Sequence, residues 1–348
     1  MKKALISIIW AIVLTMLVVS CATTAEAPEA EKAPEAVKAA EAAPAKAEEP
    51  KAEAPRAEAP KAVVLEMNGT RTEYATIEEA IAAVPAGAEA TVTINGDISV
   101  RKSSLIKDAT VTITDNGTAV TVTDAVSEGD GIQYMFKVEG TGKLIVSPKG
   151  GITFKGADPA TSSVTRVMFL VGTGYKEPDQ MSGYLEINPG VTVTGVISTS
   201  FGGIIRGYGS VIINGGTYTA SANNKGNGLI TLYSYAEING GEFYGNDSVT
   251  VGLIMVTVEC NLTINGGSFR DNAGTTSGLM KVNSKATCTI NGGEFLRNKA
   301  YNDGAGAIDA TGTVIINGGT FADNVAADVV VAESGKFTKA DSLALNVK

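Results

Sequence analysis

From residue 91 onward, hydrophobic and polar residues alternate along short stretches of the chain. Two clear examples are the sequences "TVTI" at residues 91–94 and "TVTIT" at residues 110–114. A period of two residues is typical of a β-strand with one buried face, and the glycines and asparagines between the stretches indicate turns. The pattern therefore predicts an all-β protein with many short strands.

The tetrapeptide Ile-Asn-Gly-Gly recurs five times in the second half of the chain, at steps of 25, 26, 26 and 26 residues. A related copy with Pro189 in the turn begins one period earlier, at Ile187. Asparagine and glycine accept positive φ angles at low cost, so each copy predicts a sharp turn after a strand. The five copies begin at Ile213, Ile238, Ile264, Ile290 and Ile316.

Two further positions repeat with the same period. An aromatic residue follows each tetrapeptide after two residues, and an asparagine follows most of the aromatic residues after three more. A period of 26 residues with strand-like stretches and fixed corners is typical of a parallel β-helix, in which like residues of successive coils stack about 4.8 Å apart. We expect the aromatic side chains to stack in the core and the asparagines to form ladders at the corners. The aromatic positions are Tyr218, Phe243, Phe269, Phe295 and Phe321; the asparagines are Asn246, Asn272, Asn298 and Asn324, with Asn214, Asn239, Asn265, Asn291 and Asn317 in the tetrapeptides.

We therefore predict a single-domain, right-handed parallel β-helix over residues 91–348, with about 26 residues per coil. Residues 63–90 are expected to form an N-terminal cap with a short helix that shields the first coil, as terminal repeats of solenoids must. Thr76 is the expected N-cap of this helix, and Pro85 is expected to end it. Its buried face should comprise Ile77, Ala80, Ile81 and Val84.

The first 21 residues are typical of an export signal, with two lysines and an apolar run from Ala4 to Val19. The sequence "VVSC" that ends this segment resembles the lipobox of bacterial lipoproteins, whose cysteine becomes residue one after cleavage and carries acyl chains such as palmitate. The resemblance implies lipidation of Cys21 and anchoring in a membrane. Because Ala22 follows the cysteine, it also implies sorting to the outer membrane, on its cell-surface or periplasmic face. The alternative is an ordinary secretory signal.

Residues 22–62 consist almost entirely of alanine, glutamate, lysine and proline. Such a segment can bury little apolar surface and should form a disordered tether between the lipid and the rod. The whole chain carries a formal net charge of −9 and contains no histidine. An acidic chain without a basic patch excludes nucleic acid as an expected partner.

The repeat also resembles a known family. The sequences "FYGN", "FRDN", "FLRN" and "FADN", followed by "GLI", "GLM" or "GAI", are similar to the FxxN and GGA[ILV] repeats of chlamydial polymorphic membrane proteins and other adhesin-like β-helices. The similarity covers about residues 185–330. It implies a β-helical passenger rod that takes part in adhesion. Members of that family end in a membrane barrel, whereas this sequence ends at "LALNVK", so we expect a lipid in place of the barrel.

Many β-helices are polysaccharide lyases or hydrolases, whose chemistry needs clustered carboxylates. In this sequence the repeated positions hold structural residues, and Asp247, Asp271 and Asp323 neighbour the corner asparagines, where they are expected to stabilise turns. A column expected to face outward changes its chemistry at each step, so no carboxylate pair, metal site or cofactor site is predicted. An enzyme that acts on polysaccharide and an architectural envelope protein remain alternatives. The column consists of Arg206, Thr231, Met255, Lys281 and Asp309.

Features that interrupt the repeat are the better candidates for function. Tyr208 and Tyr233 should stack in one outward column, with Tyr235 two residues further along, and Tyr175 lies in the insertion "GTGYKEPDQMSG", which should project as a loop. Rows of aromatic rings suit sugars or an extended partner, although tyrosine is also common on β-sheet surfaces for structural reasons. We therefore expect non-catalytic recognition of a glycan, a matrix component or a partner protein of the host.

Overall fold

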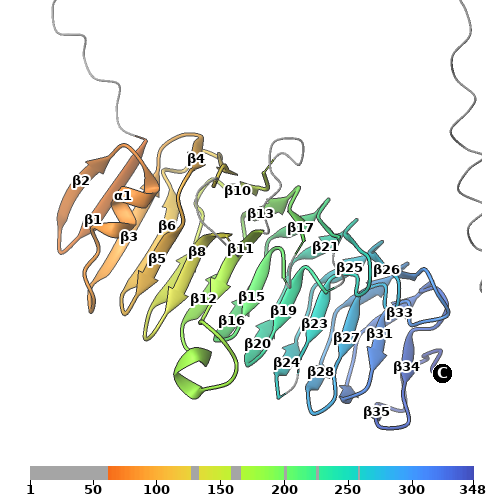
Figure 1. Cartoon of the computed structure of the whole chain (residues 1–348). Coiled ribbons are helices and arrows are strands. Elements are labelled where there is room, and N and C mark those ends of the chain that lie inside the picture. The colour runs from red at the N-terminus through yellow and green to blue at the C-terminus, as the bar shows by residue number, and fades with distance from the viewer. Residues whose placement is uncertain (1–61, 127–132, 158–165, 200–201, 225–226, 258) are drawn as a thin grey trace, which may run out of the picture. The chain divides into compact units, whose positions relative to one another are not determined.

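Strands that occupy the same place in successive coils pair side by side and in parallel, and together they form a parallel β-helix (Figure 1). The predicted all-β fold is therefore confirmed. Residues 1–21, with Cys21, and residues 22–61 of the tether lie outside the described part of the chain. The computed structural model describes residues 62–126, 133–157, 166–199, 202–224, 227–257 and 259–348.

The first sheet has twelve strands and includes the N-terminal hairpin. It contains the strands whose last residue is the isoleucine of an Ile-Asn-Gly-Gly tetrapeptide. Its order is β2 (Thr70–Tyr74), β1 (Val63–Met67), β3 (Glu89–Ile94), β6 (Thr110–Asp115), β9 (Lys143–Val146), β12 (Tyr184–Ile187), β16 (Ser210–Ile213), β20 (Tyr235–Ile238), β24 (Asn261–Ile264), β28 (Thr287–Ile290), β32 (Thr313–Ile316) and β35 (Lys336–Lys339).

The second and third sheets each have nine strands. The second follows the order β33 (Thr320–Ala322), β29 (Glu294–Leu296), β25 (Ser268–Arg270), β21 (Glu242–Tyr244), β17 (Thr217–Thr219), β13 (Val191–Thr194), β10 (Ile152–Lys155), β7 (Val120–Asp124) and β4 (Ile98–Val100). The third follows the order β34 (Val329–Val331), β31 (Ile308–Ala310), β27 (Met280–Val282), β23 (Ile254–Val256), β19 (Ile230–Leu232), β15 (Ile205–Gly207), β11 (Arg166–Val171), β8 (Gln133–Glu139) and β5 (Ser104–Lys107).

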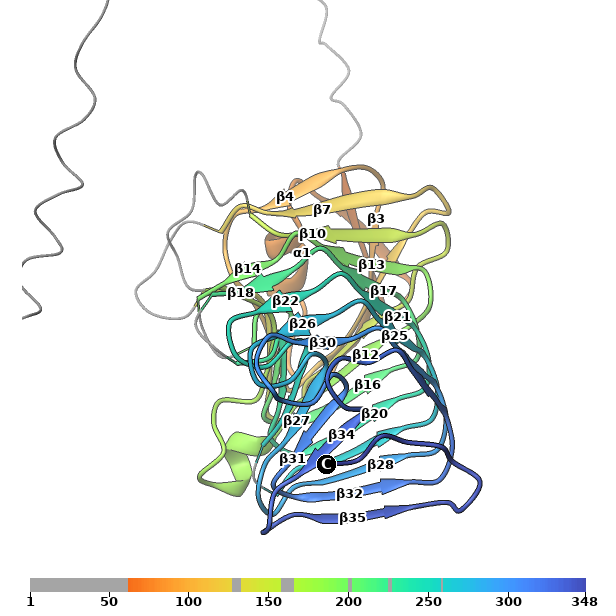
Figure 2. The same ribbon diagram turned by 90° about the vertical axis from the view of Figure 1, so that its right-hand side faces the viewer.

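A fourth sheet of five two-residue strands lies between the second and third sheets along the chain, and Figure 2 shows it at that corner. The sequence carries no signal for these strands, because two residues are too few to show an alternating pattern. Its order is β14 (Ile197–Ser198), β18 (Ala222–Asn223), β22 (Asp247–Ser248), β26 (Ala273–Gly274) and β30 (Lys299–Ala300).

The aromatic column stacks in register through five coils, as predicted. Neighbouring ring centroids lie 4.6, 4.7, 5.1 and 4.4 Å apart, and the ring planes differ by 5 to 9°. The first four rings are fully buried, whereas Phe321, next to the C-terminal end, is partly buried. Burial of each side chain stabilises the fold by roughly 1.5 to 3 kcal/mol. The first ring, Tyr218, keeps its hydroxyl satisfied by donating to the carbonyl of Gly215 at 3.2 Å.

The predicted asparagine ladders run along two corners, and their hydrogen bonds point in opposite directions. In the outer ladder each side-chain NH2 donates to the asparagine of the preceding coil, from Asn317 back to Asn188, at 2.8 to 2.9 Å. In the inner ladder each NH2 donates to the following coil, from Asn246 to Asn324, at 3.0 to 3.1 Å. The inner amides also donate to backbone carbonyls of the aromatic column, such as that of Phe243. The inner ladder therefore ties the core strands to the corner.

The glycines of the repeat are needed for two reasons, a positive φ angle at one position and a close approach of two backbones at another. The second glycine of each tetrapeptide has a positive φ, for example 109° at Gly267, whereas the tetrapeptide asparagines do not and contribute only their ladder amides. The glycine that precedes five strands of the third sheet, from β15 to β31, allows two backbones to approach. A Cβ atom added at Gly252 would lie 1.8 Å from the carbonyl oxygen of Gly278 in the next coil. Both motifs are therefore required by the backbone.

The N-terminal end of the core is covered by a hairpin and a helix, as predicted. Helix α1 (Ile77–Ala82) begins at Thr76, whose hydroxyl accepts a hydrogen bond from the Glu79 N–H at 3.2 Å. It buries Ile77, Ala80 and Ile81, while Val84 is partly buried against the same core. Strand β1 pairs antiparallel with β3, and β2 pairs antiparallel with β1, so the exposed, polar β2 forms the edge of the first sheet. Charged residues on such an edge discourage pairing with other chains.

The C-terminal end is closed by the last residues of the chain. Val347 bridges in parallel to Val329, the first residue of the edge strand β34. One carboxylate oxygen of Asp328 accepts from the last amide of the inner ladder, Asn324, at 2.8 Å, and the other accepts from the Asn346 N–H at 2.9 Å. The end of the ladder and the edge of the third sheet are thus both satisfied.

The less regular N-terminal coils use Asp115 to organise a corner. This buried carboxylate accepts hydrogen bonds from the backbone N–H groups of Gly117, Lys149, Gly150 and Gly151 at 2.7 to 3.2 Å. Burial alone raises the pKa of Asp115, but the four donors outweigh it, so the pKa lies below the ordinary aspartate value. One carboxylate here holds two coils together, as the ladders do further along.

The two ladders should contribute unequally to stability. Replacing the buried rung with leucine, in Asn272→Leu, removes the side-chain hydrogen bonds to the Phe243 carbonyl and from the Asn246 N–H, because Asn272 bonds both coils. We expect a loss of about 2 to 4 kcal/mol. The matched change in the exposed outer ladder, Asn265→Leu, should cost about 1 kcal/mol or less. Urea unfolding of both variants measures the difference, and equal losses would contradict the assignment.

One corner column holds left-handed backbone in six successive coils, from Gly195 to Asp323, with φ of 50° at Ala220 and 64° at Gly245. A Cβ at this conformation is strained by about 1 kcal/mol, which exceeds the entropic disadvantage of glycine in the unfolded chain. Ala220→Gly should therefore raise the free energy of unfolding by about 0.5 to 1 kcal/mol. The reverse change, Gly245→Ala, creates no steric clash and should lower it by a similar amount. A shift of the same sign in both variants would refute the explanation.

Candidate functional site

Three tyrosines from different parts of the chain form one stack on the outside of the third sheet. The rings of Tyr208 and Tyr233 have centroids 4.6 Å apart, in accord with the predicted column. The ring of Tyr175 lies 5.1 Å from that of Tyr233 and 6.2 Å from that of Tyr208, with interplanar angles of 14° and 25°. The Tyr175 side chain remains 57% exposed, so the stack, which we call the tyrosine stack, presents an aromatic surface to solvent.

The insertion carries Tyr175 to this position on an ordered loop. The carbonyl oxygen of Gln180 accepts the N–H groups of Thr173 at 2.9 Å and Gly174 at 3.4 Å, which closes the loop on itself. The short 3-10 helix η1 (Pro178–Met181) follows and forms the projection below the sheets in Figure 1. Gly172 begins the loop with φ of 82°, and a Cβ there would lie 2.9 Å from the Cβ of Tyr208. The predicted projecting loop is therefore packed against the tyrosine column.

A buried arginine lies beneath the tyrosines. Arg206 is 4% exposed and is hydrogen-bonded to Tyr208. Burial lowers the pKa of Arg206, while Tyr208 and Tyr233 act in the opposite direction. Burial also raises the pKa of Tyr233 to about 12, so its hydroxyl keeps its proton at physiological pH. The stack therefore places the protonated hydroxyl of Tyr233 near the guanidinium of Arg206.

Only some residues of the column predicted to face outward are accessible to solvent. Its five residues do align from coil to coil. Arg206 and Thr231 are buried, however, and Lys281 is paired with Asp309 at 3.1 Å. The expectation of exposure was wrong for the first two, because an outward direction in one strand does not tell which segments pack over it.

Tyr235, the fourth candidate, does not join the tyrosine stack. It belongs to β20 in the first sheet, where its hydroxyl donates to the carboxylate of Glu237. This bond raises the pKa of Tyr235. Its side chain is 43% exposed, so it offers a matched control for experiments on the stack.

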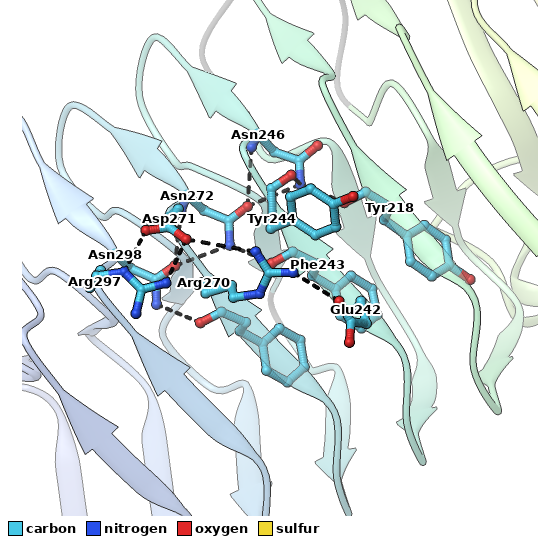
Figure 3. A network of polar contacts seen from close by, with 11 residues as sticks. Tyr218, Glu242, Phe243, Tyr244, Asn246, Arg270, Asp271, Asn272, Arg297 and Asn298 are labelled. Atoms are coloured by element: carbon cyan, nitrogen blue, oxygen red, sulfur yellow. Dashed lines mark hydrogen bonds and ion pairs between the residues drawn. The ribbon is translucent and has the colours of Figure 1, made fainter.

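A network of charges crosses the outer face of the second sheet (Figure 3). Arg270 donates to Glu242 at 2.9 Å, and its guanidinium carbon lies 4.1 Å from the ring centroid of Tyr244. Arg297 binds Asp271 through two parallel hydrogen bonds of 2.8 Å. Asp271 and Arg297 both have positive φ angles, so they occupy the left-handed corner, as expected for the turn role of Asp271. The network joins three coils.

The charge network was missed as a unit, although the sequence contains a signal for it. One corner position reads Asp271, Arg297 and Asp323 at steps of 26 residues, so charges of alternating sign meet along the rod. Hydrogen bonds from Arg297 lower the pKa of Asp271, and the same bonds raise the pKa of Arg297. A carboxylate held ionised in this way is poorly suited to donate a proton near neutral pH.

No protein-family model matches this chain, and neither the curated proteins nor the solved structures contain a match to it. Within residues 62–126, 133–157, 166–199, 202–224, 227–257 and 259–348, no group of three or more cysteine, aspartate or glutamate side chains is placed to hold a metal ion. In the same part of the chain, neither helix has the length and apolar character needed to cross a bilayer.

The Asp271–Arg297 pair makes a prediction about pH. Because the folded-state pKa of Asp271 is lowered, its pairing contributes stability above the unfolded aspartate pKa of about 3.9 and loses it as the pH falls through the folded pKa. In Arg297→Gln, the pKa of Asp271 measured by NMR titration should rise toward the ordinary value, and stability should fall less on acidification. Lys285→Gln, at another exposed left-handed corner, is the control. An unchanged pKa in Arg297→Gln would exclude the pairing.

Proposed function

We propose that the chain is an exported protein, anchored in the outer membrane through lipidated Cys21, whose β-helical rod recognises an extended partner without catalysis. The partner is a glycan, a matrix component or another protein. The tyrosine stack is the observation that carries this proposal. It interrupts an otherwise structural repeat, its Tyr175 side chain is exposed, and tyrosine is enriched where one ring face packs and an edge stays wet.

Two further features support recognition over catalysis. At the corner of the second sheet, the carboxylate of Asp271 is held by Arg297 through two hydrogen bonds. A general acid needs a raised pKa, whereas the pKa of Asp271 is lowered. The resemblance to the FxxN repeats of adhesin-like rods agrees with this role. The tether that the sequence predicts for residues 22–62 would hold the rod away from the lipid.

The lipid anchor can be tested directly in cells. We expect wild-type chain to incorporate a labelled fatty acid and to fractionate with the outer membrane, whereas Cys21→Ser should lose the label and leave the membrane fraction. The buried Cys260→Ser is the matched control and should keep the label. Equal labelling of all three proteins would place the lipid elsewhere and contradict the anchor.

Recognition by the tyrosine stack can be tested with the full chain on immobilised glycans and matrix proteins. Tyr175→Ala removes the exposed ring and should weaken binding by about tenfold or more, which is the effect of a hot-spot aromatic residue. The control Tyr235→Ala removes another exposed tyrosine, which lies outside the stack, and should change affinity by less than about twofold. Equal affinities of wild type and Tyr175→Ala would remove the stack from the proposal.

A further inference from the structure

A groove with a volume of about 300 Å³ lies over the outer face of the fourth sheet. Small side chains explain the hollow, because Ala222 and Ala273 flank Asp247 in the column that faces outward. The next outward column supplies Asn224, Val249, Thr275 and Tyr301, and all four line the groove. The groove is therefore a surface feature of four neighbouring coils.

Tyr301 is held across the coils by bonds at both ends. Its backbone N–H donates to the carbonyl of Gly274 at 2.8 Å, and its hydroxyl donates to a carboxylate oxygen of Asp247 at 2.9 Å, two coils away. The nitrogen of Lys299 lies 5.6 Å from the ring centroid. The ring nevertheless remains 52% exposed, and so does about half of the Val249 side chain. An aromatic ring that is fixed in place and open to solvent loses little conformational entropy when it binds a ligand.

The lining combines one apolar platform with a few groups that form hydrogen bonds. Tyr301 and Val249 provide the apolar surface, and the carboxylate of Asp247, the amide of Asn224 and the hydroxyl of Thr275 surround it. A sugar ring has the same division, with C–H groups on its faces and hydroxyls on its rim. The volume lies at the lower end of small-molecule sites, which suits one or two sugar rings.

Other ligand classes fit less well. A peptide cannot add a strand here, because β22 and β26 are each paired on both sides. An anionic ligand would meet the carboxylate of Asp247 within the groove. A neutral ligand avoids both obstacles.

We propose that this groove binds a neutral glycan, with a pyranose ring stacked on Tyr301 and its hydroxyls bonded to Asp247, Asn224 and Thr275. The site lies on a different sheet from the tyrosine stack. The inference therefore goes beyond the proposed recognition through that stack, and either can fail alone.

The test uses the full chain and calorimetric titration with lactose, cellobiose and maltose, with sialyllactose as the acidic counterpart of lactose. At least one neutral sugar should bind, and Tyr301→Ala should weaken its affinity about tenfold or more. Tyr301→Phe keeps the ring but loses the bond to Asp247, so it should retain most of the affinity. Asp247→Ala should weaken binding through the lost hydroxyl contacts. Because these residues are exposed, the unfolding temperature of each variant should match wild type.

Tyr175→Ala and Tyr235→Ala are the controls and should bind the sugar as wild type does. The inference is overturned if none of the neutral sugars binds at about 10 mM, if only sialyllactose binds, or if affinity survives in Tyr301→Ala. The proposed recognition function stands in all three cases when binding to an immobilised partner still depends on Tyr175. If sugar binding depends on Tyr301 but no partner's binding depends on Tyr175, the result supports the glycan site in the groove and contradicts recognition by the tyrosine stack.

Discussion

Backbone hydrogen bonding between successive coils, in register, is the constraint on which the rest of this structure depends. Each inner strand exchanges backbone hydrogen bonds with the strands of both neighbouring coils, so a residue has its counterpart of the next coil about 4.8 Å away. Aromatic rings then meet aromatic rings, and amides meet amides. The rings contribute burial and the amides contribute hydrogen bonds that no isolated coil could form, so stability is shared between neighbours along the rod.

Some segments of the coil keep a constant length from one coil to the next, and others do not. The number of residues between the tetrapeptide and the inner ladder is the same in these coils. For example, Glu242 lies four positions after Ile238, and Ser268 lies four positions after Ile264. The length changes at the corner after the fourth sheet and at the corner between the third and first sheets. Tyr301 lies at the first of these corners and Tyr175 at the second. The asparagine ladders hold one half of the coil constant, and the other half is free to carry irregular surface features.

This division explains what the sequence could predict. The aromatic column, both ladders and helix α1 depend on the repeat period and on the conformational preferences of single residues. Both can be read from one sequence, and the structure contains all of these features. The pairing of Tyr208 with Tyr233 follows from the same period. The burial of Arg206 and the placement of Tyr175 depend on how an insertion packs, and the reach of Tyr301 to Asp247 crosses two coils. Those contacts join residues that no period relates.

Stacking also limits where ligand chemistry can arise. A charged residue repeated at one position would face its own copy in the next coil, and like charges at that spacing destabilise the fold. The corner of Asp271, Arg297 and Asp323 avoids this by alternating sign, and the carboxylate of Asp271 is bonded to Arg297. Uniform columns must therefore be neutral or self-compensating. Groups that remain available to a ligand have to come from positions where successive coils differ, and the tyrosine stack and the groove at Tyr301 both lie at such positions.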